Sequence, residues 1–147
     1  MRGSLHESLR LRRAGPGATD GGMTTGSGER ILIAEDDRDI RDIIEFKLGT
    51  ADYTVDLAGD GLAAWEAFQA TPPDLAVLDI MMPGLSGIDV LRKIRESSAP
   101  DVPVLLLSAK GQNADLAVHI GATDYMAKPF SPRELLDHVN GILARAR

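Results

Sequence analysis

Three short, uninterrupted apolar runs constrain the fold of this chain more than any other feature. They are ILIA (31–34), LAVL (75–78) and VLLL (104–107). Runs of this length are typical of strands that are buried on both faces, as in a parallel sheet. Two further segments, 54–57 and 124–127, alternate or mix apolar and polar residues. We therefore expect five strands, with these last two at the edges of the sheet.

Apolar residues between these strands recur at helical spacing. The helical patterns lie around 40–48, 62–68, 88–94, 116–120 and 135–143. Five strand–helix pairs joined by right-handed crossovers predict an α/β fold with a doubly wound parallel sheet. Placing the buried strands in the centre selects the strand order 2-1-3-4-5, a flavodoxin-like three-layer sandwich. The ligand crevice of such a sheet lies beyond the carboxyl ends of strands 1 and 3.

The charges of this 147-residue chain divide unevenly. Residues 1–28 carry a net charge of +2 and the remaining residues a net charge of −8. Such an acidic domain repels phosphate backbones, so we expect no direct nucleic-acid binding by it. The chain has no cysteine, which excludes disulfides and thiolate chemistry. No apolar run approaches the ~18 residues of a membrane span, and we expect a cytoplasmic protein.

The first 28 residues differ in composition from the rest. They hold seven of the fifteen glycines and few apolar residues. Such a segment is predicted to be a disordered tail, with the folded domain at 29–147. No signal-peptide pattern follows the first methionine, and Met23 is an alternative start.

Polar residues follow four of the predicted strands and should meet at one edge of the sheet. They are Glu35, Asp36, Asp37, Asp79, Ser108 and Lys128. A small group of carboxylates is the ligand type that Mg²⁺ uses when it also contacts phosphate. An ionised carboxylate is a competent nucleophile towards phosphorus. Lys128 and the metal would neutralise the charge of a transferring phosphoryl group, with Ser108 as a neutral donor.

Two other functions of such a sheet fit the residues less well. A phosphatase of the haloacid dehalogenase kind needs a second aspartate two residues after its nucleophile, and Met81 stands there. A flavin-binding flavodoxin needs a hydroxyl- and glycine-rich phosphate loop after strand 1, where the acidic triplet 35–37 would repel phosphate.

Residues 30–146 resemble the receiver domain of two-component response regulators. Four motifs carry this resemblance: ILIAEDD (31–37), LAVLDIMMPGLSGIDVLRKIR (75–95), LLLSAKG (105–111) and GATDYMAKPF (121–130). It implies a phosphorylation switch whose phosphoryl donor is a sensor histidine kinase or phosphotransfer protein. Catalysis would be limited to its own phosphoryl transfer and slow self-dephosphorylation.

The resemblance also implies a role for each residue that matches a motif. Asp79 would be the phosphoacceptor, and Mg²⁺ would be held by Glu35, Asp36, Asp79 and the backbone carbonyl of Met81. Ser108 and Tyr125 would be the switch residues that respond to the new phosphoryl group, and Lys128 would contact it. Asp37 would cap the first helix, and the bond from Lys128 to Pro129 would be cis.

The chain departs from the best-known receivers in its fourth helical region. Ser108 and Gly121 are thirteen positions apart, about two fewer than expected. Asp124 and Glu134 are suited to pairing across a dimer, but Thr123 and His138 replace an expected acid and arginine. We therefore expect a monomer or a weak dimer.

Residues 1–147 contain no sequence pattern of an output domain, and three alternatives stay open. The chain is a stand-alone receiver that contacts a downstream protein, a receiver fragment of a longer transcription regulator, or a receiver used mainly as a protein-binding module.

Overall fold

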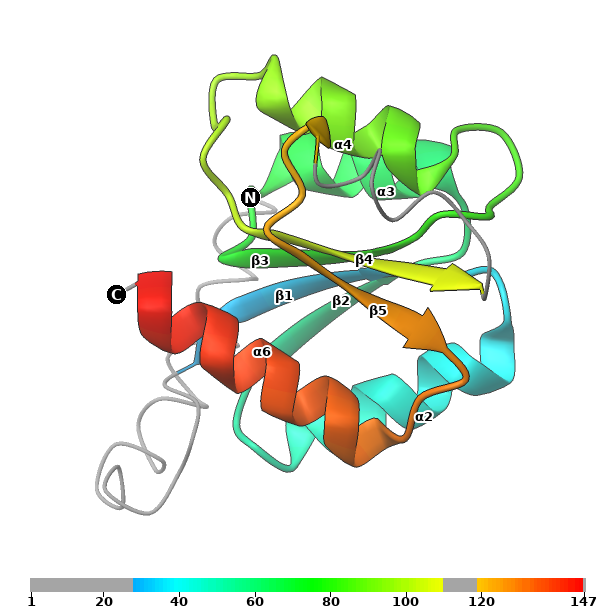
Figure 1. Ribbon diagram of the computed structural model, residues 1–147, viewed down its shortest axis with the longest axis vertical. Coiled ribbons are helices and arrows are strands. Elements are labelled where there is room, and N and C mark those ends of the chain that lie inside the picture. The colour runs from blue at the N-terminus through cyan, green and yellow to red at the C-terminus, as the bar shows by residue number, and fades with distance from the viewer. Residues whose placement is uncertain (1–27, 110–118, 147) are drawn as a thin grey trace.

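The computed structural model describes residues 28–109 and 119–146 and shows one five-stranded parallel sheet. The strand order is β2-β1-β3-β4-β5, which confirms the predicted order. The strands are β1 (Arg30–Ala34), β2 (Thr54–Ala58), β3 (Leu75–Asp79), β4 (Val104–Ala109) and β5 (Asp124–Lys128). The three uninterrupted apolar runs are the three inner strands, and β2 and β5 form the edges (Figure 1).

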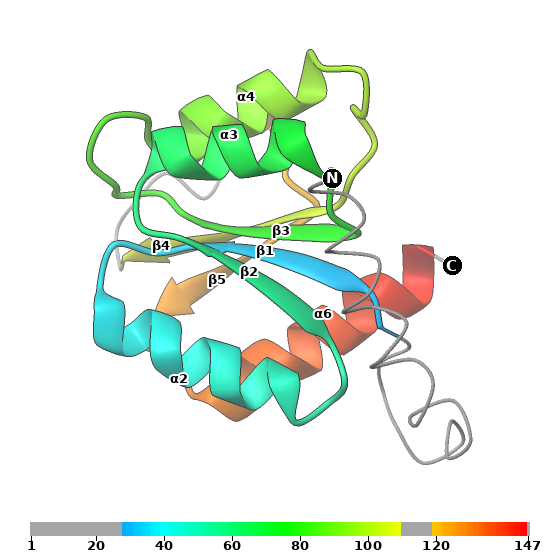
Figure 2. The same ribbon diagram turned by 180° about the vertical axis from the view of Figure 1, so that it is seen from behind.

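Helices cover both faces of the sheet and complete the predicted three-layer sandwich (Figures 1 and 2). Helices α3 (Gly61–Ala70) and α4 (Gly87–Arg95) lie on one face. Helices α2 (Arg38–Gly49) and α6 (Pro132–Ala146) lie on the other. Most of the helix expected around 116–120 lies outside the described residues, because 110–118 are not described. The expected tail, 1–28, also lies outside them except for Gly28.

Successive side chains of the inner strands point to opposite faces of the sheet and pack into two separate hydrophobic cores. In β1, Ile31 and Ile33 pack into the core beneath α2 and α6, whereas Leu32 and Ala34 pack into the core beneath α3 and α4. All five residues of β1 and of β3 are buried. Burial on both faces explains why these strands read as uninterrupted apolar runs rather than as alternating ones.

Short polar side chains fix where the helices begin. Asp37 caps α2, because its carboxylate accepts hydrogen bonds from the backbone N–H groups of Asp39 and Ile40 at 2.9 and 3.2 Å. This confirms the capping role predicted for Asp37. Ser86 and Asp89 form a reciprocal capping box at the start of α4.

Two glycines allow the loop after β3 to pass close to neighbouring helices. A Cβ atom on Gly87 would lie 2.4 Å from the carbonyl oxygen of Asp79, and one on Gly61 would lie 1.9 Å from that of Leu85. Both distances are far below van der Waals contact, so only glycine fits at these positions. The loop that follows Asp79 is thereby held between the starts of α3 and α4.

Among the described residues, no helix is both long enough and apolar enough to cross a membrane.

Candidate functional site

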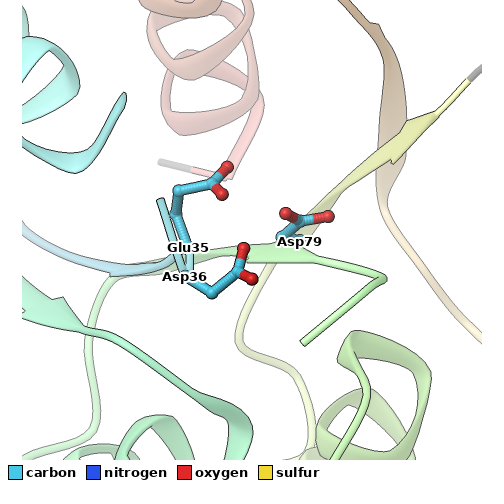
Figure 3. A group of neighbouring side chains, drawn as sticks. All are labelled: Glu35, Asp36 and Asp79. Atoms are coloured by element: carbon cyan, nitrogen blue, oxygen red, sulfur yellow. The ribbon is translucent and has the colours of Figure 1, made fainter. Parts of the chain in front are cut away.

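Carboxylates from two neighbouring strands meet at the carboxyl edge of the sheet (Figure 3). Asp79 is the last residue of β3, and Glu35 and Asp36 directly follow β1. Oxygen atoms of the three side chains all lie within 4.8 Å of one another. Glu35 and Asp79 are buried, whereas Asp36 is exposed, so the cluster opens towards solvent on one side.

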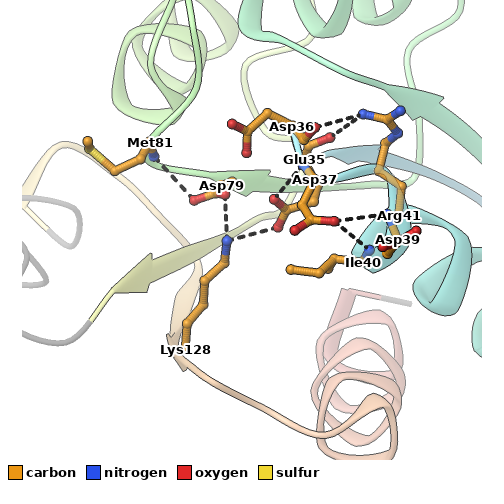
Figure 4. A network of polar contacts seen from close by, with 9 residues as sticks. All are labelled: Glu35, Asp36, Asp37, Asp39, Ile40, Arg41, Asp79, Met81 and Lys128. Atoms are coloured by element: carbon orange, nitrogen blue, oxygen red, sulfur yellow. Dashed lines mark hydrogen bonds and ion pairs between the residues drawn. The ribbon is translucent and has the colours of Figure 1, made fainter.

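Lys128 joins this cluster from β5 and pairs with both buried carboxylates. Its Nζ lies 2.6 Å from Oδ2 of Asp79 and 2.9 Å from Oε1 of Glu35 (Figure 4). The following peptide bond, from Lys128 to Pro129, is cis. The structure thus brings together four of the residues that the sequence predicted at this edge: Glu35, Asp36, Asp79 and Lys128.

Burial and the ion pair between them have opposite effects on the pKa values of Glu35 and Lys128. Burial raises the pKa of the Glu35 carboxyl; the hydrogen bond from Lys128 opposes this rise without cancelling it. Burial alone would lower the pKa of Lys128, but hydrogen bonds to Asp79 and Glu35 outweigh it, and the pKa is raised. Lys128 is therefore a firmly held cation between two carboxylates.

The other predicted residues differ in how they relate to the site. The backbone N–H of Met81 donates to Oδ1 of Asp79 at 3.2 Å, while its side chain is 63% exposed. Only the backbone of Met81 is therefore suited to a role at the site. Ser108 is buried one residue beyond Leu107, the β4 partner of Asp79. Tyr125 lies on the edge strand β5 and is 41% exposed.

Arg41 is a supporting residue that the sequence analysis missed. Its Nη1 donates to the backbone carbonyls of Glu35 at 2.9 Å and of Asp36 at 3.3 Å (Figure 4). In addition, Oε2 of Glu35 accepts a hydrogen bond from the backbone N–H of Asp37 at 3.2 Å. These contacts hold the acidic loop in place from α2. No motif marks Arg41, because it contacts only backbone atoms.

A small apolar cavity adjoins the site and was also not predicted. It has a volume of about 230 Å³, and its walls are formed by Ile40, Ile43, Ile44, Lys128, Pro129, Phe130 and Pro132. Ile43 is 52% exposed, which is high for a large apolar side chain. A partly exposed apolar surface beside a charged site is suited to contact with another protein.

The carboxylate cluster fits the predicted Mg²⁺ on chemical grounds. Three carboxylate oxygens lie close together with one side open, and a hard, partly hydrated cation prefers such oxygen ligands. The positive charge of Lys128 offsets only part of the negative charge of three carboxylates, which leaves an excess for a cation to neutralise.

Asp124 and Glu134 both have partners within the chain. Oδ2 of Asp124 lies 3.3 Å from Nδ1 of His138, and Oε1 of Glu134 accepts a hydrogen bond from the backbone N–H of Ser131 at 2.8 Å. The expectation of a monomer or a weak dimer stays a prediction.

The chain belongs to the family of response regulator receiver domains. The model of this family matches residues 31–140, which include every residue of the site described above. The fold of the chain and the motifs in its sequence agree with this membership.

Particular relatives show how the chain compares with whole regulators. It is 43% identical over 119 residues to the probable transcriptional regulator ycf27 of Guillardia theta, a match covering 80% of this chain and 46% of that protein. It is 40% identical over 120 residues to the response regulator MprA of Mycobacterium ulcerans, covering 80% and 51%. The chain thus spans about half the length of these curated relatives.

A solved receiver domain has the same fold. The receiver domain of Francisella response regulator 1452 superposes with a TM-score of 0.76 at 33% sequence identity. That match covers 81% of this chain and 99% of the Francisella domain.

Proposed function

We propose that this receiver accepts a phosphoryl group on Asp79 from a phosphohistidine of a sensor histidine kinase or phosphotransfer protein. One observation carries the proposal: Asp79 is only 3% exposed, ends an inner strand, and is paired with a lysine beside two further carboxylates. A carboxylate with only a structural role would not need a second and third acid within 4.8 Å.

In the proposed reaction, a carboxylate oxygen of Asp79 attacks phosphorus in line with the phosphorus–nitrogen bond of the donor. That bond breaks, and its electron pair returns to the histidine nitrogen. Lys128 would contact an oxygen of the transferred group, and Ser108 would donate a hydrogen bond to it. Bound Mg²⁺, held by Glu35, Asp36, Asp79 and the Met81 carbonyl, would neutralise charge on the phosphoryl oxygens.

The consequence of this transfer would be a change on the face that includes β5 and α6, together with the helix expected around 116–120, most of which lies outside the described residues. Ser108 would move towards the new charge, and Tyr125 would turn inward from its exposed position at the sheet edge. The output is then read by a downstream protein or by a further domain of a longer chain. The match covers only about half of the relatives named as transcriptional regulators, which favours a further domain.

The phosphoacceptor is tested by intact-mass measurement after incubation with acetyl phosphate and Mg²⁺. Wild type should gain one phosphoryl group, and Asp79→Asn should gain none. Asp42→Asn is the matched control, because it removes an exposed carboxylate of α2 outside the cluster. An adduct on Asp79→Asn, or none on wild type, contradicts the proposal.

The apolar cavity beside Lys128 supports a donor that is itself a protein. Ile43→Asp should slow phosphotransfer from a histidine kinase that phosphorylates wild type, while labelling by acetyl phosphate stays unchanged. Leu62→Asp is the control, because Leu62 is equally exposed at 54% but lies on α3, on the opposite face of the sheet. Equal rates of phosphotransfer to wild type, Ile43→Asp and Leu62→Asp would show that the donor does not contact the apolar surface around Ile43.

A further inference from the structure

Arg41 holds the backbone of the loop that carries Glu35 and Asp36. Its Nη1 has two N–H groups and donates to both backbone carbonyls, at 2.9 Å to Glu35 and at 3.3 Å to Asp36. The side chain reaches back from α2 to this loop (Figure 4). The backbone N–H of Glu35 donates in turn to the carbonyl of Ala58 at 3.1 Å, which ties the loop to the end of β2. The loop is therefore fixed from two sides, by β2 and by α2.

The carboxylate of Asp36 depends on this backbone contact more than the other two acids of the cluster do. Glu35 and Asp79 are buried, and each is paired with Lys128. Asp36 is exposed, and none of the residues that the structure describes bonds to its carboxylate (Figure 4). The course of its backbone places this carboxylate within 4.8 Å of the other two, and the bond from Arg41 to its carbonyl fixes that course.

The position of the Arg41 guanidinium also depends on Gly59. Gly59 directly follows β2, and a Cβ atom added there would lie 2.9 Å from Nη1 and 3.6 Å from Cζ of Arg41. The shorter of these distances is below van der Waals contact, so a larger residue would push the guanidinium away. The glycine thus leaves the room that Arg41 needs to reach both carbonyls.

We infer that Arg41 is a positioning residue for the divalent cation, and that it sets the cation affinity of the carboxylate cluster through the backbone of Asp36. The inference rests on the Mg²⁺ site of the proposed function. Residues that orient metal ligands from outside the ligand shell change metal affinity by about 10- to 100-fold when they are replaced. Arg41 acts in this way through two backbone carbonyls rather than through a ligand side chain.

The charge of Arg41 and its hydrogen bonds have opposite effects on cation binding. A positive charge near the carboxylates repels a divalent cation, so removal of the charge alone would strengthen binding. Removal of the two hydrogen bonds would weaken binding, because the loop must then be ordered at the moment when the cation binds. The direction of the change in affinity therefore distinguishes a positioning role from a purely electrostatic one.

The test measures Mn²⁺ binding to the full chain, because Mn²⁺ takes the same oxygen ligands as Mg²⁺. The EPR signal of free Mn²⁺ gives the dissociation constant without a phosphoryl donor, and added Mg²⁺ should displace the bound Mn²⁺. Arg41→Met keeps the apolar stem and should bind Mn²⁺ at least about tenfold more weakly than wild type. Arg38→Met is the matched control, because it removes an exposed arginine from the same helix, and it should bind no more weakly than wild type.

A second variant leaves Arg41 and its charge in the chain. Gly59→Val should displace the guanidinium and weaken Mn²⁺ binding, whereas Gly49→Val, where an added Cβ has no atom within 4 Å, should not. Unchanged or tighter binding by Arg41→Met overturns the inference, and so does a Gly59→Val protein that binds like wild type.

The same titration separates this inference from the proposed function. A wild type that binds no Mn²⁺ overturns the Mg²⁺ site and the inference together, whereas equal affinities of wild type and Arg41→Met overturn only the inference. Because no phosphoryl donor is present, neither result depends on whether Asp79 accepts a phosphoryl group.

Discussion

Replacing Lys128 with methionine should reveal how strongly the buried acids depend on it. At 2.6 and 2.9 Å, with an effective dielectric constant of about 20, each of its ion pairs is worth about 6 kcal/mol before desolvation. Methionine keeps the length and apolar stem but removes the charge. Glu35 and Asp79, both buried, would then face each other without a cation.

The folded variant can relieve this repulsion by binding a proton on Glu35. At pH 7, protonating a carboxyl whose ordinary pKa is 4.5 costs about 3 kcal/mol. This cost is smaller than the lost ion pair, so protonation should occur and should set the destabilisation. We expect Lys128→Met to lower the free energy of unfolding by about 3 kcal/mol at pH 7 without metal.

The pH dependence follows from the direction of the pKa shift. Burial already raises the pKa of Glu35 in the wild type, and loss of Lys128 raises it further. A carboxyl with a raised folded pKa binds more protons when folded, so stability is present below the unfolded pKa and is lost as pH rises towards the folded one. The difference between variant and wild type should therefore shrink to about 1.4 kcal/mol at pH 5.5.

Urea denaturation followed by circular dichroism between pH 5 and pH 8, in EDTA, measures these differences. Lys47→Met is the control, because Lys47 makes no ion pair in the described part of the chain. Added Mg²⁺ should restore much of the stability of Lys128→Met. A loss that is independent of pH, or no larger than that of Lys47→Met, would refute this account of the site.

Two further predictions concern the fold and use the same unfolding measurement. Gly61→Ala should lower the free energy of unfolding by more than about 2 kcal/mol, because the added Cβ would overlap the carbonyl of Leu85. Gly49→Ala is the control: open space surrounds Gly49, so this change should be neutral or should stabilise the fold by up to about 1 kcal/mol. Asp56→Ala should cost about 3 kcal/mol by leaving Arg30 buried without its partner, and Arg30→Met added to it should recover most of that loss; additive losses would contradict this pairing.

The sheet was predictable because its signals are local and strong. The inner strands are buried on both faces, and this burial appears in the sequence as short, uninterrupted apolar runs. Once the order of the strands is known, residues at the carboxyl ends of β1, β3 and β5 are expected at the same edge of the sheet. This is why the positions of Glu35, Asp79 and Lys128 followed from the sequence.

The features that were missed depend on side chains that reach across the fold. Arg41 bonds to backbone carbonyls that any residue would offer, so its sequence context carries no signal. The apolar cavity joins α2 to the loop after β5, and only the packing of α2 against α6 brings these segments together. The contact between His138 and Asp124 likewise depends on the register of α6 against β5.

The residues of the charged cluster come from three strands spread across most of the folded chain. Asp79 and Lys128 alone are 49 positions apart, and Lys128 ends β5, the fifth strand of the sheet along the chain. No single hairpin or strand–helix unit contains the site, so it exists only after β5 has docked. An incomplete or partly unfolded chain would lack the lysine cation between its two buried acids. Under the proposed function, such a chain would not accept a phosphoryl group. Under the proposed function, phosphoryl transfer to Asp79 would therefore require that β1, β3 and β5 are already part of one sheet.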